Sequence, residues 1–192
     1  MTVIAGRLPA YTGHVWLDGL DLRSLLPEGR ARLGMLPEQV PAYQELTVEG
    51  HFELLRVFHP RWNERLVAEL TERLRVDPGQ RISKLSKGTR VKVGFIAAEA
   101  IDPDLLLLDE PTSGLDPVIR GELLDIIDER LRANPHRVLL FSTHILEDIA
   151  RVARRVLLIH DGRLIDDQPI EAFDAGSGST AQALYDRIRA HA

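Results

Sequence analysis

The sequence contains no cysteine, few aromatic residues and no long hydrophobic run. Aromatic residues make up 5% of the 192 residues, and Cys is absent. Without cysteine the chain has no disulfides, thiolate zinc ligands or Cys nucleophile, which fits a reducing compartment such as the cytoplasm. No segment approaches the run of about 18 apolar residues of a membrane span, and residues 1–20 lack a signal peptide's pattern. Any membrane role is therefore expected to be peripheral.

The sequence also has no excess of positively charged residues. The chain has 24 Lys and Arg against 29 Asp and Glu, a net charge of −5, and the charges are spread along its length. This argues against a bulk basic surface, so no nucleic-acid partner is expected, although a local basic patch stays open. With 44% hydrophobic and 28% charged residues, the composition is that of a globular protein, and the length favours a single domain over residues 1–192.

Hydrophobic periodicity divides the first half of the chain into short strands and longer helices. Apolar runs bounded by Gly or Pro predict strands at 13–19 and 32–36. Apolar residues recur at helical spacing from 47 to about 75, and a further helix is predicted over 86–100. These helices predict a helical subdomain inserted over about 46–100.

The second half of the chain alternates strands with helices. The predicted strands lie at 105–108, 138–142 and 156–159, and the predicted helices at 118–133, 145–153 and about 180–192. Asn63 in the insert and Asp116, which precedes Pro117, are the expected N-caps of two helices. The alternation predicts the α/β class with a parallel sheet.

The strongest chemical feature is the run LLLLDEPTSGLD at residues 105–116. Asp109 and Glu110 follow an apolar strand, at the edge where α/β sheets bind ligands. In a nucleotide site the first carboxylate can hold Mg²⁺, and the second can orient and polarise an attacking water. An isolated Asp-Glu pair more often just ends a strand in solvent, but the continuation to residue 116 favours the functional interpretation.

Two further segments are candidates for phosphate chemistry. LSKG at 85–88 opens a predicted helix, where unpaired N–H groups, the Ser86 hydroxyl and the small Gly88 suit an anion. An ordinary Ser N-cap explains the same residues and is the better interpretation of that segment alone. His144 stands at the end of the strand, just after Thr143, where a lone His is more often a surface residue than a catalytic one.

Together these segments resemble the nucleotide-binding domain of ATP-binding cassette (ABC) transporters. LSKG at 85–88 resembles the ABC signature, residues 105–110 resemble the Walker B motif, and SGLD at 113–116 resembles the D-loop. His144 resembles the switch histidine of the H-loop. Residues 12–19 resemble an early antiparallel strand of the family, and the loop at Glu38 resembles its Q-loop. The resemblance runs from Ala5 to about Ile165. It implies a P-loop NTPase-like α/β core with a parallel sheet, a helical subdomain insert and part of an antiparallel β subdomain.

The resemblance also implies roles for individual residues. Asp109 would ligate Mg²⁺, Glu110 would act as general base and His144 would steady the γ-phosphate of ATP. Two such domains pair head to tail in this family, so a second nucleotide-binding domain is an expected partner.

The remaining nucleotide-binding residues implied by the resemblance lie in three loops. Ser86 and Gly88 would serve the nucleotide of the second domain, and Asp116 would also contribute to nucleotide binding. Glu38 stands where the family usually has Gln, with Gln39 beside it, which weakens the implied contact with Mg²⁺ and the attacking water.

One expected motif is missing from the 192 residues. No G-x-x-x-x-G-K-[ST] occurs, although in P-loop ATPases this loop cradles the phosphates and holds Mg²⁺. Residues 1–6 resemble the end of the helix that follows a P-loop. We hypothesise that Met1 is an internal methionine of a longer ancestor whose first strands and P-loop lie upstream. Such a chain alone is expected to be poorly stable and prone to associate.

Three functions stay open. The first is the ATP-binding subunit of an exporter-like ABC transporter, at the inner face of the cell membrane, with transmembrane permease subunits docked on the insert near Phe58 and Trp62. A small satellite core explains these two aromatics equally well. The second is a non-catalytic partner or remnant of such an ATPase. The third, a soluble ABC protein of DNA repair or translation, fits least, because the insert is short and the net charge negative.

Overall fold

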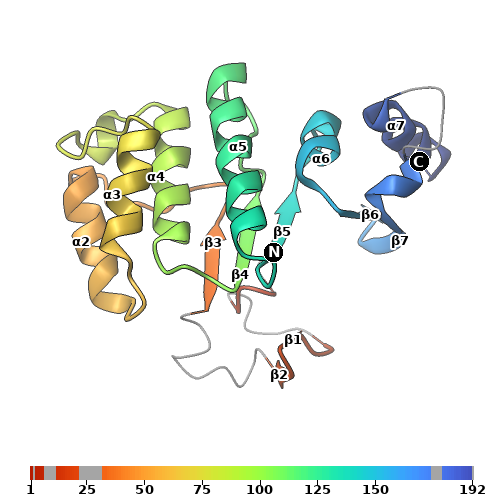
Figure 1. Cartoon of the computed structure of the whole chain (residues 1–192), viewed down its shortest axis with the longest axis horizontal. Helices are drawn as coiled ribbons and strands as arrows, with labels where there is room; N and C mark the ends of the chain where they lie inside the picture. The colour runs from red at the N-terminus through yellow and green to blue at the C-terminus, as the bar shows by residue number, and fades with distance from the viewer. Residues whose placement is uncertain (2, 7–11, 22–31, 174–178, 192) are drawn as a thin grey trace.

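A three-stranded parallel sheet lies at the centre of the molecule (Figure 1). The computed structural model describes residues 1, 3–6, 12–21, 32–173 and 179–191. The sheet has the order β3 (Leu33–Leu36), β4 (Leu105–Asp109), β5 (Val138–Ser142). Both outer strands pair in parallel register with β4, so the carboxyl ends of all three lie at one edge. The predicted α/β class with a parallel sheet is confirmed.

Three helices lie side by side next to β3 (Figure 1). They are α2 (Val48–Phe58), α3 (Glu64–Arg73) and α4 (Lys87–Glu99), with a short 3₁₀ helix, η2 (Ile82–Lys84), before α4. The side chains of Thr47, Asn63 and Ser86 cap their N-termini by accepting backbone N–H bonds, as expected of Asn63 from its residue type. We call α2, α3 and α4 the helical layer.

The strands of the sheet are joined by helices of the predicted kind. α5 (Pro117–Ala133) connects β4 to β5, with Asp116 as N-cap and Pro117 in the first turn, as predicted. α6 (Leu146–Val152) follows β5. Both helices lie on the same side of the sheet in Figure 1.

The strand predicted at 156–159 is present but does not join the parallel sheet. It forms β6 (Arg155–His160), which pairs antiparallel with β7 (Arg163–Pro169) in a separate two-stranded sheet. Asp161 and Gly162 both have positive φ, 46° and 71°, which is the backbone of a tight hairpin turn. The expectation that this strand extends the parallel sheet is therefore wrong, because a local Asp-Gly turn pairs it with its neighbour in sequence.

Two terminal regions complete the described structure. After η3 (Ile170–Phe173), the chain ends in α7 (Thr180–His191), which packs on α6. Near the start, β1 (Trp16–Leu17) and β2 (Leu20–Asp21) form a small antiparallel hairpin, so the strand predicted at 13–19 is shorter than expected. Residues 7–11 and 22–31 lie outside the described residues.

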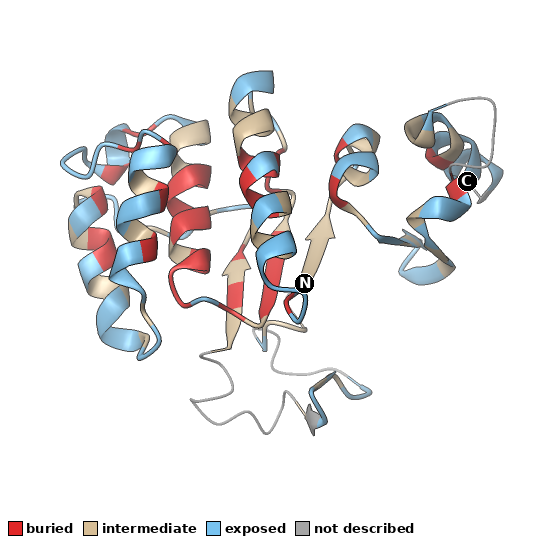
Figure 2. Ribbon diagram, in the orientation of Figure 1, coloured by how far each residue is buried: buried red, intermediate tan, exposed pale blue. Residues whose placement is uncertain are grey.

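The hydrophobic core lies between the sheet, the helical layer and α5 (Figure 2). All four leucines of β4 are at most 7% exposed. Close packing of α4 on β3 depends on Gly94, where an added Cβ would lie 2.7 Å from the Leu36 side chain. Trp62 packs against this core, 6.2 Å from the Phe52 ring, whereas Phe58 is 70% exposed. Phe58 therefore has the exposure that a docking contact needs, whereas Trp62 belongs to the core, the alternative left open for this pair.

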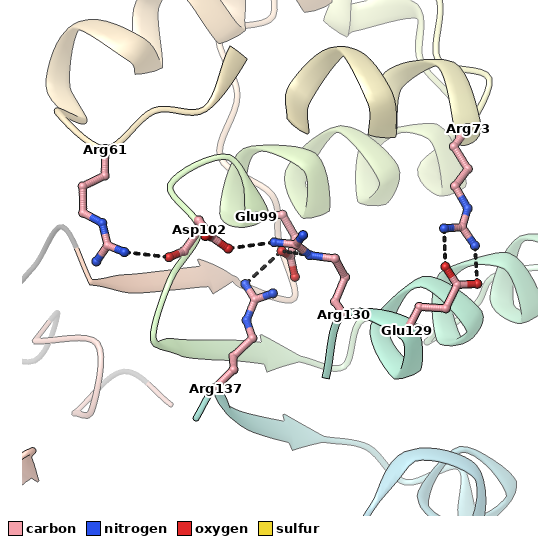
Figure 3. Close-up of polar contacts among 7 residues, drawn as sticks. All are labelled: Arg61, Arg73, Glu99, Asp102, Glu129, Arg130 and Arg137. Atoms are coloured by element: carbon pink, nitrogen blue, oxygen red, sulfur yellow. Dashed lines mark hydrogen bonds and ion pairs between the residues drawn. The ribbon is translucent and has the colours of Figure 1, made fainter. Parts of the chain in front are cut away.

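Ion pairs tie α4 and its following loop to α5 and the start of β5 (Figure 3). The Glu99 carboxylate is buried and accepts from Arg130 (3.1 Å) and from Arg137 (2.8 Å). Arg130 also donates to Asp102 (2.8 Å). One residue before Arg130 on α5, the exposed Glu129 accepts from both ends of the Arg73 guanidinium of α3, at 2.5 and 2.6 Å.

Arg61, in the turn between α2 and α3, reaches the same region from the other side by donating to the backbone oxygen of Asp102 at 3.0 Å (Figure 3). These contacts lie at the start of β4 and β5, opposite the carboxyl edge of the sheet. In the described part of the chain, no helix has the length and apolar character needed to cross a membrane.

Candidate functional site

Asp109 and Glu110 lie at the carboxyl edge of the sheet, where β4 meets β5. The Ser142 hydroxyl donates to Asp109 Oδ1 at 2.6 Å, and the Glu110 amide donates to Ser142 Oγ at 3.1 Å. Ser142 is the register partner of Asp109, so strand pairing places its hydroxyl here. Both carboxylates are half-buried. The pair is therefore held by the neighbouring strand instead of simply ending in solvent.

Glu110 and His144 face each other across this edge. His144 Nδ1 lies 3.1 Å from Glu110 Oε1 and 2.9 Å from Oε2. The Glu110 side chain is 25% exposed and the imidazole is 72% exposed. Glu110 also adopts φ +50°, an unfavourable backbone for a residue with a Cβ, which turns the chain out of the strand. The structure thus brings together three predicted site residues from two adjacent strands.

Ser86 caps α4 and is exposed. Its Oγ accepts the Thr89 N–H at 3.1 Å and lies 2.9 Å from the Thr89 hydroxyl. Both contacts are those of an ordinary helix N-cap. No acidic residue occupies the first turn, and Lys87 adds positive charge there. The helix end therefore combines free N–H groups with a cation, an arrangement that attracts anions.

Gly88 has a packing role that the sequence did not predict. A Cβ added here would lie 2.9 Å from Ile119 Cδ1 and 3.7 Å from Leu115 Cδ2. The glycine therefore lets the start of α4 approach the start of α5 and the loop before it. Because of this contact, the 85–88 segment and the 113–116 segment lie side by side.

The loop at 113–116 ends in the N-cap of α5. Asp116 Oδ1 accepts the N–H groups of Val118 and Ile119, each at 3.1 Å. Gly114 has φ +67°, and a Cβ there would lie 2.7 Å from Lys87 Nζ. The positive φ therefore favours glycine at this position, whereas the exposed end of the Lys87 side chain can shift away from a Cβ.

Glu38 lies apart from these contacts. It is exposed in the loop after β3, beside the exposed Gln39, and β3 ends at the same edge of the sheet as β4. The predicted residues thus form two groups, Asp109–Glu110–His144 and Ser86–Gly88–Asp116, with Glu38 beside the first.

Sequence reasoning missed Ser142, Thr112, Arg120 and Asp148. Thr112 Oγ1 donates to Asp148 Oδ2 and Arg120 Nε donates to Asp148 Oδ1, both at 2.5 Å. Ser142 could have been found from strand register, as the polar end of an apolar strand beside Asp109. Asp148 gave no signal, because it is one of two adjacent acidic residues on a short helix.

The donor set at this edge suits Mg²⁺ that arrives with phosphates. Carboxylate oxygens are the hard ligands that Mg²⁺ prefers, and in nucleotide sites it uses one or two of them together with phosphate oxygens. Asp109 offers such a carboxylate, oriented by Ser142. Within the described ranges, no group of three or more His, Cys, Asp or Glu could hold a metal without such help.

Comparison with known proteins places this geometry in a family. The model of the family described as ABC transporter matches residues 1–113. The thiamine import ATP-binding protein ThiQ of Yersinia pseudotuberculosis is 31% identical over 96% of this chain and 79% of its own length. The energy-coupling factor transporter ATP-binding protein EcfA2 of Symbiobacterium thermophilum is 37% identical over 83% of this chain and 58% of its own length.

Solved structures agree. An ATP-binding subunit of an ABC transporter superposes with a TM-score of 0.82 at 26% identity, covering 96% of this chain and 80% of that one. The dimeric ATP-binding cassette MJ0796, bound to ADP and Pi, has a TM-score of 0.76 at 19% identity over 88% and 78% of the two chains, which shows the shared fold. The chain therefore belongs to the ABC transporter family and has the fold of its nucleotide-binding domain.

Proposed function

We propose that this chain is the ATP-binding subunit of an ABC transporter and couples ATP binding and hydrolysis to transport through separate membrane subunits. The observation that carries the proposal is the Asp109–Glu110 pair at the carboxyl edge, with His144 within 3.1 Å of the Glu110 carboxylate. A carboxylate suited to Mg²⁺ next to a carboxylate that can orient water supplies two of the parts that metal-assisted attack of water on a phosphate uses.

In the proposed reaction the three residues have separate tasks. Asp109 would hold Mg²⁺ through a carboxylate oxygen, and the ion would supply charge neutralisation at the phosphates. Glu110 takes the proton that the attacking water loses, because its carboxylate is held at the end of β4 and partly withdrawn from solvent. His144 shares this side of Glu110 and is exposed enough to contact the terminal phosphate.

The second group of residues acts on a second subunit in this proposal. Ser86 and Lys87 present hydroxyl, N–H groups and charge at an exposed helix end, so they suit a phosphate held by a facing nucleotide-binding domain. Asp116 contributes by fixing the neighbouring loop. Glu38 is proposed to lie near Mg²⁺ and the attacking water.

A membrane subunit is proposed to dock on the helical layer. Val57 and Phe58, at the end of α2, are 77% and 70% exposed, and this apolar pair suits contact with a protein partner. The chain would then work at the inner face of the membrane. An exporter-like direction stays a prediction, and the relatives named above include an import protein.

One observation favours a second candidate, a non-catalytic partner in an ATPase pair. Residues 1–192 contain no G-x-x-x-x-G-K-[ST] loop to cradle phosphates. In that case Ser86 and Lys87 still serve the nucleotide of the facing subunit, while Asp109 and Glu110 hold none. Variants of the two groups therefore distinguish the candidates.

The test is ATP hydrolysis by the complex that an affinity-tagged copy of the chain brings from cell membranes. Ser86→Asp and Ser86→Asn both keep a side chain that caps α4, but only Asp adds negative charge. We expect Ser86→Asp to lower the ATPase rate at least about tenfold relative to Ser86→Asn, the loss for one charge-assisted phosphate contact. Equal rates in the two variants, or a tagged complex without ATPase activity, contradict both candidates. Glu110→Gln separates them, because the proposal predicts a large loss of rate and the non-catalytic partner predicts none.

A further inference from the structure

Asp148 is the most completely buried carboxylate near the candidate site, and it joins three elements. The residue is 0% exposed on α6. It accepts from Thr112 Oγ1 and from Arg120 Nε, each at 2.5 Å. Thr112 is itself 1% exposed. A buried carboxylate with two such donors is held firmly in place.

The two donors lie next to the candidate site in sequence. Thr112 is in the turn that begins at Glu110, where the Ser113 amide donates to the Glu110 oxygen at 3.2 Å. Arg120 is in the first turns of α5, just after the Asp116 cap. Asp148 is on α6, the helix that begins after His144. One carboxylate therefore fixes the turn after Glu110 against the helix after His144.

The Thr112–Asp148 hydrogen bond lies beyond the end of the β4–β5 pairing, where strand hydrogen bonds no longer hold the chain in place. The β4–β5 ladder ends at the Asp109–Ser142 pair, and Glu110 leaves the strand with positive φ. Beyond that point, the described contacts that hold the turn to α6 run through side chains, and Thr112 to Asp148 is the buried one.

We propose that Asp148 is a positioning residue for the reaction assigned to Glu110, holding the turn of residues 110–113 so that Glu110 and His144 keep their mutual orientation. This inference rests on the proposed function. It also extends to the loop at 113–116, because the Leu115 amide donates to the Thr112 oxygen at 3.2 Å and the loop starts from the same turn.

The chain provides matched variants for a test. Asp148→Ala removes the nearer and fully buried carboxylate from the partly buried Arg120, leaving it only Glu147 at 3.7 Å, and can simply unfold the protein. Thr112→Val instead removes one hydroxyl and leaves the Arg120–Asp148 pair, whereas Thr112→Ser keeps the hydroxyl. Asp125→Asn is the control, because the Asp125–Arg151 pair also joins α5 to α6 but is exposed and does not touch the turn.

The first readout is steady-state ATP hydrolysis by the tagged complex, at equal amounts of folded protein. We expect Thr112→Val to lower kcat about 10- to 100-fold, the effect of a small misplacement of catalytic groups, with KM for ATP within about twofold. Thr112→Ser and Asp125→Asn are expected to keep the wild-type rate. Equal kcat for the Val and Ser variants, or an equal loss in Asp125→Asn, overturns the inference.

The second readout needs no activity. Amide hydrogen exchange of residues 113–115 in the 192-residue chain is expected to become faster in Thr112→Val than in Thr112→Ser, because the local hydrogen bonds of the turn open more often. Unchanged exchange overturns the positioning role. Failure of the proposed function has a different signature, since Glu110→Gln then leaves the ATPase rate unchanged while Thr112→Val still accelerates exchange.

Discussion

β4 and β5 have nearly the same composition and very different burial. Both are five-residue strands of mostly apolar residues, LLLLD and VLLFS. The leucines of β4 are at most 7% exposed, whereas Val138 of β5 is 53% exposed and the rest of β5 is half-buried. β4 pairs with a strand on each side, and β5 pairs with β4 alone in the described structure. Position in the sheet, not composition, therefore decides how much each strand contributes to the core.

The same difference in burial distinguishes the core side of the molecule from the β6–β7 hairpin. The helical layer, β4 and α5 enclose the core, which Figure 2 shows as the concentration of buried residues. On the β6–β7 hairpin, Leu157, Ile159 and Leu164 are 46%, 66% and 57% exposed. We call these three side chains the hairpin patch. The candidate site lies at the boundary, with Asp109 from the buried strand β4 and Ser142 from the half-buried strand β5.

The largest expected effect comes from truncating equivalent leucines in the two strands. Leu107 of β4 is 0% exposed, so Leu107→Ala should lower the free energy of unfolding by about 4 kcal/mol through lost burial and a cavity. Leu140 of β5 is half-buried, and Leu140→Ala should cost about 1 kcal/mol. Urea denaturation followed by circular dichroism measures both. Equal losses would show that β5 is as enclosed as β4.

A buried and an exposed ion pair should likewise differ in how much they stabilise the fold. Glu99→Gln removes the charge that pairs with the buried Arg137, so it should destabilise the fold by about 3 kcal/mol. Glu129→Gln breaks an exposed pair with Arg73 and should leave the denaturation midpoint unchanged. If the two variants have the same denaturation midpoint, the buried ion pairs of Glu99 with Arg130 and Arg137 do not stabilise the fold more than the exposed pair does.

Lowering the pH should reduce the stability of the protein through a buried histidine of the helical layer, His51. Burial lowers the pKa of His51 from its ordinary value of 6.5, so the unfolded state binds more protons as the pH falls below about 6.5. Stability is therefore complete above that pH and decreases below it. His51→Phe should flatten the stability profile between pH 7 and 5, whereas His136→Gln, at an exposed position, should leave the profile as in the wild type. Parallel profiles for all three proteins would contradict this.

The smallest effect on stability is expected at the hairpin patch. Ile159→Lys should leave the unfolding free energy within about 0.5 kcal/mol, because the side chain is already exposed. It should nevertheless reduce self-association of the chain, since Ile159 and its strand partner Leu164 are both exposed apolar side chains. Sedimentation velocity over a concentration series measures this, with Ala190→Lys on exposed α7 as the control of equal charge. Association that is unchanged in Ile159→Lys would locate the contact elsewhere.

Local signals in the sequence predicted much of the architecture. Residue types specified the caps Asn63 and Asp116, and apolar runs specified β4 and β5. The parallel pairing followed from the alternation of strands and helices. The antiparallel pairing of β6 did not follow from this alternation, because the Asp161-Gly162 dipeptide forms a hairpin turn that joins β6 to β7.

For the site, the sequence predicted the residues that share a strand end but not the contacts between distant segments. Asp109 and Glu110 stand together in the chain, whereas Ser142 reaches them only through register. Gly88 and Ile119 meet because two helices pack closely, which no local pattern indicates. Asp148 likewise depends on α6 folding back on the turn at Thr112. Such contacts are properties of the tertiary structure.

The most direct test of the account is the ATP hydrolysis rate of the membrane complex carrying Glu110→Gln, compared with Glu129→Gln as a control at an exposed carboxylate. General-base catalysis predicts a loss of about 10²- to 10⁴-fold for the first variant and none for the second. A wild-type rate in Glu110→Gln would contradict the catalytic role of this site and leave the non-catalytic partner as the function of the chain.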